Sequence, residues 1–219
     1  MIHLFPHWNW DSSVDTVEVW AFSNAAEVEL FLNNESLGRQ PSGNYAHAAW
    51  PTVKNTPGNL YAVAYDANNK TIANQRIETT SDPVALRISV KDGVGADGLV
   101  AGCKDVALIQ VEVVDVQGRV VPIANDNITF SISSSQGDGN DVLAYLGGGN
   151  GDPSEHTPDK SAVRPAFGGL VLGVFSSTAT PGTVKVTASS PGLQADSLEI
   201  TTKANTGPAT WWCAGYEEL

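Results

Sequence analysis

Apolar and polar residues alternate at every second position along most of this sequence, whereas the 3.6-residue period of an amphipathic helix is nearly absent. Val17, Val19 and Ala21 give the first example, and the pattern returns in short segments as far as residues 197–201. Turn residues separate these segments. At Asn33-Asn34, for instance, asparagine tolerates the positive φ that a tight hairpin needs. Alternation with this period places one face of each strand in a core, so we predict an all-β protein.

The strand pattern stops at Ser81-Asp82-Pro83 and restarts at Leu86. Proline pushes the residue before it into an extended conformation and cannot donate to a sheet, so it ends strand pairing. We therefore predict two consecutive immunoglobulin-like β-sandwich domains, over residues 1–82 and 83–203. Residues 204–219 break the pattern and contain Trp211-Trp212-Cys213. We interpret them as an irregular tail, either added by cloning or left by a truncated reading frame.

The charge of the chain excludes some partners. The formal net charge is −12, whereas nucleic acid and anionic membrane surfaces need clustered Lys and Arg, so we exclude both. A neutral partner such as a glycan fits this charge better. No apolar run approaches the roughly 20 residues of a membrane span. Met1 is followed almost at once by Pro6 and Trp8, so no secretory signal peptide is visible, and we expect the start to be a cut in a longer chain.

Patterns that would bind a metal are weak. Cys103 and Cys213 are the only cysteines and have no metal-ligand spacing, and the sequence leaves open whether they pair. Residues 92–98 and 137–141 are rich in Gly and Asp, as calcium loops are, but neither follows the twelve-residue EF-hand pattern. Ordinary turns use the same residues. We therefore predict no cofactor and name no metal ligand, with calcium as the alternative.

Catalytic patterns are also weak. A retaining glycosidase needs two carboxylates about 5 Å apart, commonly on a (β/α)₈ barrel of roughly 250 residues. This chain of 219 residues lacks the alternating helices of such a barrel and any Gly-x-Ser-x-Gly elbow. Its one acid–base cluster comprises Asn150, Asp152, Glu155 and His156, in a long loop over residues 147–165. We favour a polar loop organised by its own hydrogen bonds over an active site, and expect it to be mobile around residues 157–161.

Four tryptophans are the candidates for contact with a carbohydrate: Trp8, Trp10, Trp20 and Trp50. Indole rings stack on the C–H faces of sugar rings and add an N–H donor. The competing interpretation, which we favour, is that these rings fill the core of a small sandwich.

Several segments resemble the module that follows the catalytic barrel in bacterial family 2 glycoside hydrolases of the β-galactosidase type. In the first half they are HLFPHWNW at 3–10, VEVW at 17–20, SNAAEVELFLN at 23–33, PGNL at 57–60 and AVAYD at 62–66. The second half is similar to the next immunoglobulin-like domain of that family, through VEVVD at 111–115, GNGDP at 149–153, AFGGL at 166–170 and PGT at 181–183. The resemblance spans residues 3–202, and PHWNW and GNGDP are its most specific parts.

The resemblance implies a non-catalytic accessory or scaffolding fragment. The barrel that bears the family's catalytic glutamate pair is absent, so no catalytic residue is carried over and we expect no activity from this chain alone. The implied partner is that missing barrel, and the parent enzyme would be secreted or periplasmic. Two alternatives stay open: a carbohydrate-binding module that uses exposed Trp residues, and a small hydrolase that uses Asp152, Glu155 and His156.

Overall fold

The computed structural model describes residues 1–43, 46–95, 98–102, 104–134 and 137–207. All regular elements in this part of the chain are β-strands, sixteen of them, which confirms the predicted all-β fold of consecutive β-sandwiches. The same residues include no helix able to cross a membrane. The chain divides into two compact units, Met1–Thr80 (unit 1) and Ser81–Leu219 (unit 2).

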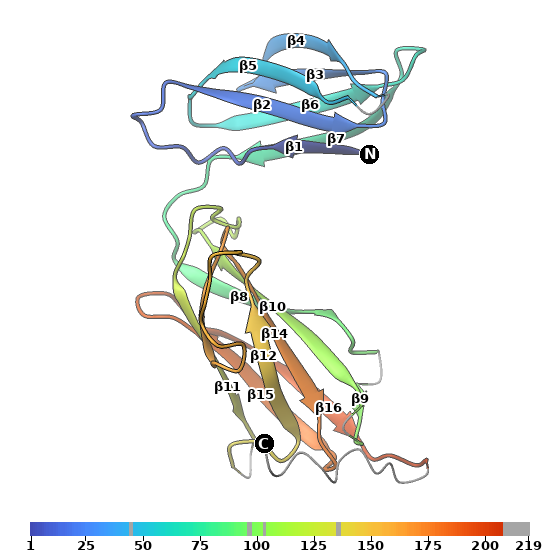
Figure 1. The fold of residues 1–219 in the computed structure, drawn as a ribbon, viewed down its shortest axis with the longest axis vertical. Coiled ribbons are helices and arrows are strands. Elements are labelled where there is room, and N and C mark those ends of the chain that lie inside the picture. The colour runs from blue at the N-terminus through green and yellow to red at the C-terminus, as the bar shows by residue number, and fades with distance from the viewer. Residues whose placement is uncertain (44–45, 96–97, 103, 135–136, 208–219) are drawn as a thin grey trace. The chain divides into compact units, whose positions relative to one another are not determined.

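Unit 1 is a sandwich of two antiparallel sheets (Figure 1). The three-stranded sheet has the order β1-β2-β5, with bounds Ile2–Phe5, Thr16–Ser23 and Ala48–Lys54. The four-stranded sheet has the order β4-β3-β6-β7, with bounds Glu35–Pro41, Glu27–Leu32, Asn59–Tyr65 and Thr71–Glu78. The predicted hairpin joins β3 to β4, where Asn33 and Asn34 have φ of 51° and 70°.

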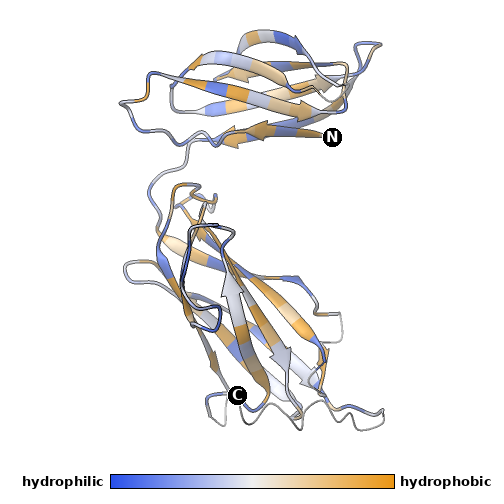
Figure 2. Cartoon of the chain, in the orientation of Figure 1, coloured by the Kyte–Doolittle hydropathy of each residue, from blue (hydrophilic) through white to orange (hydrophobic). Residues whose placement is uncertain are grey.

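The two-residue period decides which side chains of unit 1 reach its core. On β2, Val17, Val19 and Ala21 are buried, while Trp20 and Phe22 lie on the opposite face of the strand. Side chains from both sheets form one apolar cluster, which lacks any residue of unit 2. Figure 2 shows the same alternation of hydrophobic and hydrophilic residues along the strands. Burial of this cluster is the main force that stabilises the unit.

Unit 2 is a larger sandwich with a separate core. One sheet has the order β12-β14-β10-β8, with bounds Leu143–Gly149, Leu170–Ser177, Val106–Val114 and Ala85–Asp92. The other has the order β13-β11-β15-β16-β9, with bounds Val163–Pro165, Asn127–Ser133, Gly182–Ser189, Asp196–Lys203 and Leu99–Val100. Only the short β16–β9 pair is parallel among these ladders. The rings of Phe130, Tyr145 and Phe175 contact one another in or beside the core, with Phe130 and Tyr145 stacked and Phe175 edge-on to both.

A buried carboxylate organises the turn after β10. The side chain of Asp115 is fully buried and accepts hydrogen bonds from the backbone N–H groups of Ser81, Gln117 and Arg119 at 2.9–3.1 Å. The guanidinium of Arg119 donates to the same carboxylate at 2.6 and 2.9 Å. Burial raises the pKa of Asp115, but the hydrogen bonds from Arg119 and from the backbone outweigh it and lower the pKa to about 2.

Candidate functional site

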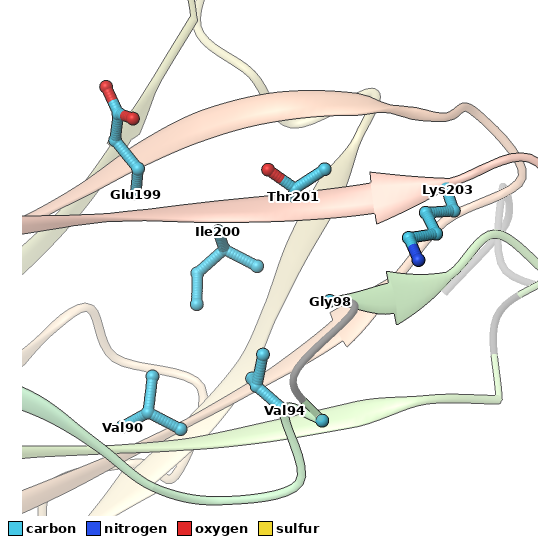
Figure 3. A pocket seen from close by; sticks show the side chains of 8 residues that line it. Val90, Val94, Gly98, Glu199, Ile200, Thr201 and Lys203 are labelled. Carbon is cyan, nitrogen blue, oxygen red and sulfur yellow. The ribbon is translucent and has the colours of Figure 1, made fainter.

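A hollow lies between β8 and β16, and its described lining residues include one carboxylate, that of Glu199. It has a volume of about 420 Å³ and is lined by Val90, Val94, Gly95, Gly98, Glu199, Ile200, Thr201 and Lys203. Figure 3 shows Ile200 directed towards Val90 and Val94, with the carboxylate of Glu199 on the other side of the strand. One carboxylate beside aliphatic side chains does not provide the acid and nucleophile of a glycosidase.

The acid–base cluster of the long loop is held by local hydrogen bonds. Asn150 donates to the carbonyl of Pro165 and accepts from the N–H of Asp152, while His156 is exposed. Hydrogen bonds from Ser154 lower the pKa of Asp152, and hydrogen bonds from Thr157 lower the pKa of Glu155. Both carboxylates are therefore ionised at neutral pH. A general acid needs a raised pKa, so these contacts agree with a self-organised polar loop.

Residues 157–161, which we expect to be mobile, make several hydrogen bonds to neighbouring segments. Arg164 is 3% exposed, and its guanidinium donates to the carbonyls of Thr157 and Pro158 at 3.1 and 3.0 Å. The N–H of Gly148 in β12 also donates to the carbonyl of Asp159 at 2.9 Å. The two carbonyls therefore accept from some of the N–H donors of the buried guanidinium. Its Nε has no hydrogen-bond partner among the described residues.

We expect the 219-residue chain to hydrolyse aryl β-galactosides and β-glucosides no faster than buffer does. An enzyme lowers the barrier by about 8 kcal/mol or more through preorganised groups, and the loop offers two ionised carboxylates instead of an acid and a nucleophile. Release of the aryl group, followed spectrophotometrically, measures this. Turnover that survives purification and is lost in Asp152→Ala or Glu155→Ala would make the loop an active site.

The structure separates the four tryptophan candidates. Trp8 and Trp50 are 1% and 5% exposed, and their Nε1 atoms donate to the carbonyls of Thr56 and Gly38. Both rings fill the core of unit 1 and offer no face to a sugar. Trp20 is half-buried, and Trp10 is 37% exposed. Any carbohydrate contact of these tryptophans therefore depends on Trp10 and Trp20.

Trp20 belongs to an exposed group of rings that we call the aromatic face: Phe5, Trp20, Phe22 and His47. Phe5 of β1 lies opposite Trp20 in the ladder, with ring centroids 6.0 Å apart. His47, just before β5, lies 4.7 Å from Trp20 and 5.3 Å from Phe22. Phe5 and Phe22 remain 51% and 42% exposed. Phe22 and His47 were not singled out from the sequence, although the apolar residues on both faces of β2 were a signal.

The loop after β1 presents a second aromatic pair. The His7 and Trp10 rings stack 4.8 Å apart at 25°, and Trp10 Nε1 donates to the His7 carbonyl at 2.9 Å. Asn9 exchanges hydrogen bonds with Thr80, from its Nδ2 to Oγ1 at 2.8 Å and from the Thr80 N–H to its Oδ1 at 3.0 Å. The hydroxyl of Thr79 donates to the Trp8 carbonyl at 2.7 Å. The PHWNW segment is thus fixed to residues 79–80.

Metal ligands do not converge in the part of the chain that the structure covers. Among those residues, no group of three or more His, Cys, Asp or Glu is placed to hold a metal ion. In the 137–141 segment, Asp138 instead accepts the N–H of Asn140 as in an ordinary turn. Cys103 and Cys213 lie outside the described residues, as do most of the predicted tail and residues 96–97 of the other Gly/Asp-rich segment.

Comparison with known proteins finds a matching domain family for each of the two units. Residues 94–199 match the family model of the glycoside hydrolase family 2 C-terminal domain 5, and residues 15–73 match a domain of unknown function, DUF4982. Beta-galactosidase BoGH2A of Bacteroides ovatus is 34% identical over 202 residues, which cover 91% of this chain and 22% of that protein. The chain consists of C-terminal modules of glycoside hydrolase family 2. The predicted resemblance is confirmed.

Further relatives of these family 2 modules support the same assignment. A beta-glucuronidase of Formosa agariphila is 30% identical over 207 residues, 91% of this chain and 19% of that protein. A beta-glycosidase from Bacteroides vulgatus superposes with a TM-score of 0.79 at 25% identity, over 91% of this chain and 24% of that one. The chain therefore spans about a fifth of the length of its curated relatives. It is an accessory C-terminal portion that does not include the family's catalytic barrel.

Proposed function

We propose that this chain supports the catalytic domain of a β-galactosidase-like family 2 enzyme, and that the aromatic face of unit 1 docks on that domain. The parent enzyme would act on β-glycosides outside the cytoplasm. The aromatic face carries the proposal, because exposed and contiguous aromatic side chains usually mark an interface. About four fifths of the length of the curated relatives lies outside the matched segment, which provides a covalently linked partner large enough to cover it.

The chemistry of the aromatic face favours a protein partner. Its rings pack against one another at tilted angles of 35–83°, so they form a compact apolar cluster and no flat platform. Phe5 and Phe22 keep much of their surface exposed, so they are the rings that a docked domain would cover. Full burial of Phe5 and Phe22 would contribute roughly 1–3 kcal/mol each.

A chimera tests the docking. This chain would replace the matching segment of the Bacteroides ovatus β-galactosidase, with and without the double substitution Phe5→Ser and Phe22→Ser. We expect the double variant to lower the temperature of thermal inactivation by roughly 4–8 °C, because a few kcal/mol of interface burial is lost. The activity that remains after heating at graded temperatures measures this shift.

Ile72→Ser is the matched control, because Ile72 is 45% exposed on the other sheet of unit 1. It should leave the inactivation temperature of the chimera unchanged. In the isolated chain, the double variant should shift the melting temperature of unit 1 much less than it shifts the chimera. Equal shifts in the chimera and the isolated chain would show that the aromatic face only stabilises its own unit, and the docking proposal would fail.

A further inference from the structure

We propose that Trp10, backed by His7, is a stacking site for a neutral sugar ring of an oligosaccharide. The site itself follows from the geometry of the PHWNW loop, residues 6–10. The choice of a carbohydrate as ligand rests on the proposed role in a glycoside hydrolase. This site is separate from the aromatic face, because the described ring contacts of Trp10 involve His7 alone.

Trp10 is held in one orientation although 37% of it is exposed. Its indole N–H donates to the His7 carbonyl at 2.9 Å, and one face of the indole lies against the imidazole, 4.8 Å away at 25°. A different rotamer would break both contacts. An exposed aromatic ring that is fixed in advance loses little conformational entropy on binding, which favours recognition of a ligand.

The backbone beneath the pair is also fixed. Trp8 is 1% exposed and anchors the loop in the core, while the side chain of Asn9 is tied to Thr80 by reciprocal hydrogen bonds. Trp8 is therefore a positioning residue for the site, and Trp10 is the residue that would contact the sugar. Because the segment is a loop and no strand, the two indoles differ in burial although they are two positions apart, and Trp10 stays exposed.

The polar groups beside Trp10 suit hydroxyls. His7 Nδ1 accepts the N–H of Asn9 at 3.2 Å, so in the neutral ring the proton lies on Nε2, where it can be donated. Burial lowers the pKa of His7, which favours this neutral form. The carboxylate of Asp11, the next residue, is exposed and accepts the N–H of Ser13 at 2.8 Å, and its remaining lone pairs can accept from hydroxyls. A carboxylate here, in a chain of net charge −12, disfavours sugars that carry a carboxylate of their own.

Titration of the 219-residue chain tests the site. Cello-, galacto- and xylo-oligosaccharides are the neutral probes, and an oligosaccharide with glucuronic acid is the anionic probe. We expect saturable binding of at least one neutral probe, with the largest ¹H–¹⁵N shift at the Trp10 indole, and at least several-fold weaker binding of the anionic probe. Trp10→Ala should weaken binding at least about tenfold, since one aromatic stacking contact contributes on the order of 1–2 kcal/mol.

Two further variants keep the test decisive. Trp10→Phe should retain part of the affinity because a smaller ring still stacks. Phe167→Ala removes a ring that is 49% exposed in unit 2 and should leave binding unchanged. Absence of binding with every neutral probe, or equal affinity in Trp10→Ala and the wild type, would overturn the site. If Trp10→Ala instead lowers only the inactivation temperature of the chimera, then Trp10 is a protein contact. The docking proposal is tested with substitutions at Phe5 and Phe22, and the sugar site with substitutions at Trp10. Each proposal can therefore fail without the other.

Discussion

Trp8→Ala is expected to lower the free energy of unfolding of unit 1 by roughly 3–5 kcal/mol and to leave unit 2 unchanged. The indole is the largest fully buried side chain of the described residues, and its Nε1 donates to the Thr56 carbonyl at 3.0 Å. Truncation would leave a large cavity and an unpaired carbonyl. A unit of about 80 residues is stable by only about 4–12 kcal/mol, so this loss brings unit 1 close to unfolding.

Urea titration of the isolated chain measures the effect. Unit 1 contains four of the six tryptophans, so tryptophan fluorescence reports mainly its transition, whereas circular dichroism follows both units. Trp10→Ala is the matched control, because Trp10 lies two positions away and is exposed, and its cost should stay below about 1 kcal/mol. Equal losses in the two variants would contradict the burial that distinguishes these tryptophans.

Asp115→Asn is expected to destabilise unit 2 at neutral pH by roughly 2 kcal/mol and to make its stability less dependent on pH. The folded pKa of about 2 lies below the ordinary value of 3.8. The folded state therefore binds fewer protons than the unfolded state in this range. The stabilising contribution of Asp115 is present above about pH 4–5 and is lost as the pH falls towards 2.

Urea midpoints of unit 2 at pH 7, 4 and 2 check this prediction. The difference between the wild type and Asp115→Asn should be largest at pH 7 and clearly smaller at pH 2, where about half of the wild-type carboxyl groups are protonated. Asp82→Asn is the matched control, since Asp82 is an exposed carboxylate of the same unit. It should follow the wild-type curve. A gap between Asp115→Asn and the wild type that stays constant from pH 7 to pH 2 would contradict a role for the charge.

The strands were predictable because their signal is local. Alternation along β2 and the asparagine pair after β3 each depend on a few neighbouring residues, and the structure places both as expected. The aromatic face was harder to predict, because it depends on how strands pair. His47 joins Trp20 only through the register of β5 against β2, which a single sequence does not specify.

The sequence also did not predict which polar and aromatic side chains of the loops are buried. Arg164 looks like a solvated cation in a loop rich in Gly and Asp, yet the carbonyls of Thr157 and Pro158 make its burial tolerable. Trp8 and Trp10 are two positions apart, and in a strand they would lie on the same face. Their segment is a loop, so Trp8 is buried and Trp10 is exposed. Such assignments require three-dimensional contacts.

The separate apolar clusters of the two units bear on how this chain can evolve. Since neither cluster includes a residue of the other unit, a genetic crossover between codons 80 and 81 would leave both cores intact. Either module could then be exchanged, duplicated or lost without a change in the core of the other one. The two family matches lie on opposite sides of this point, one within each module.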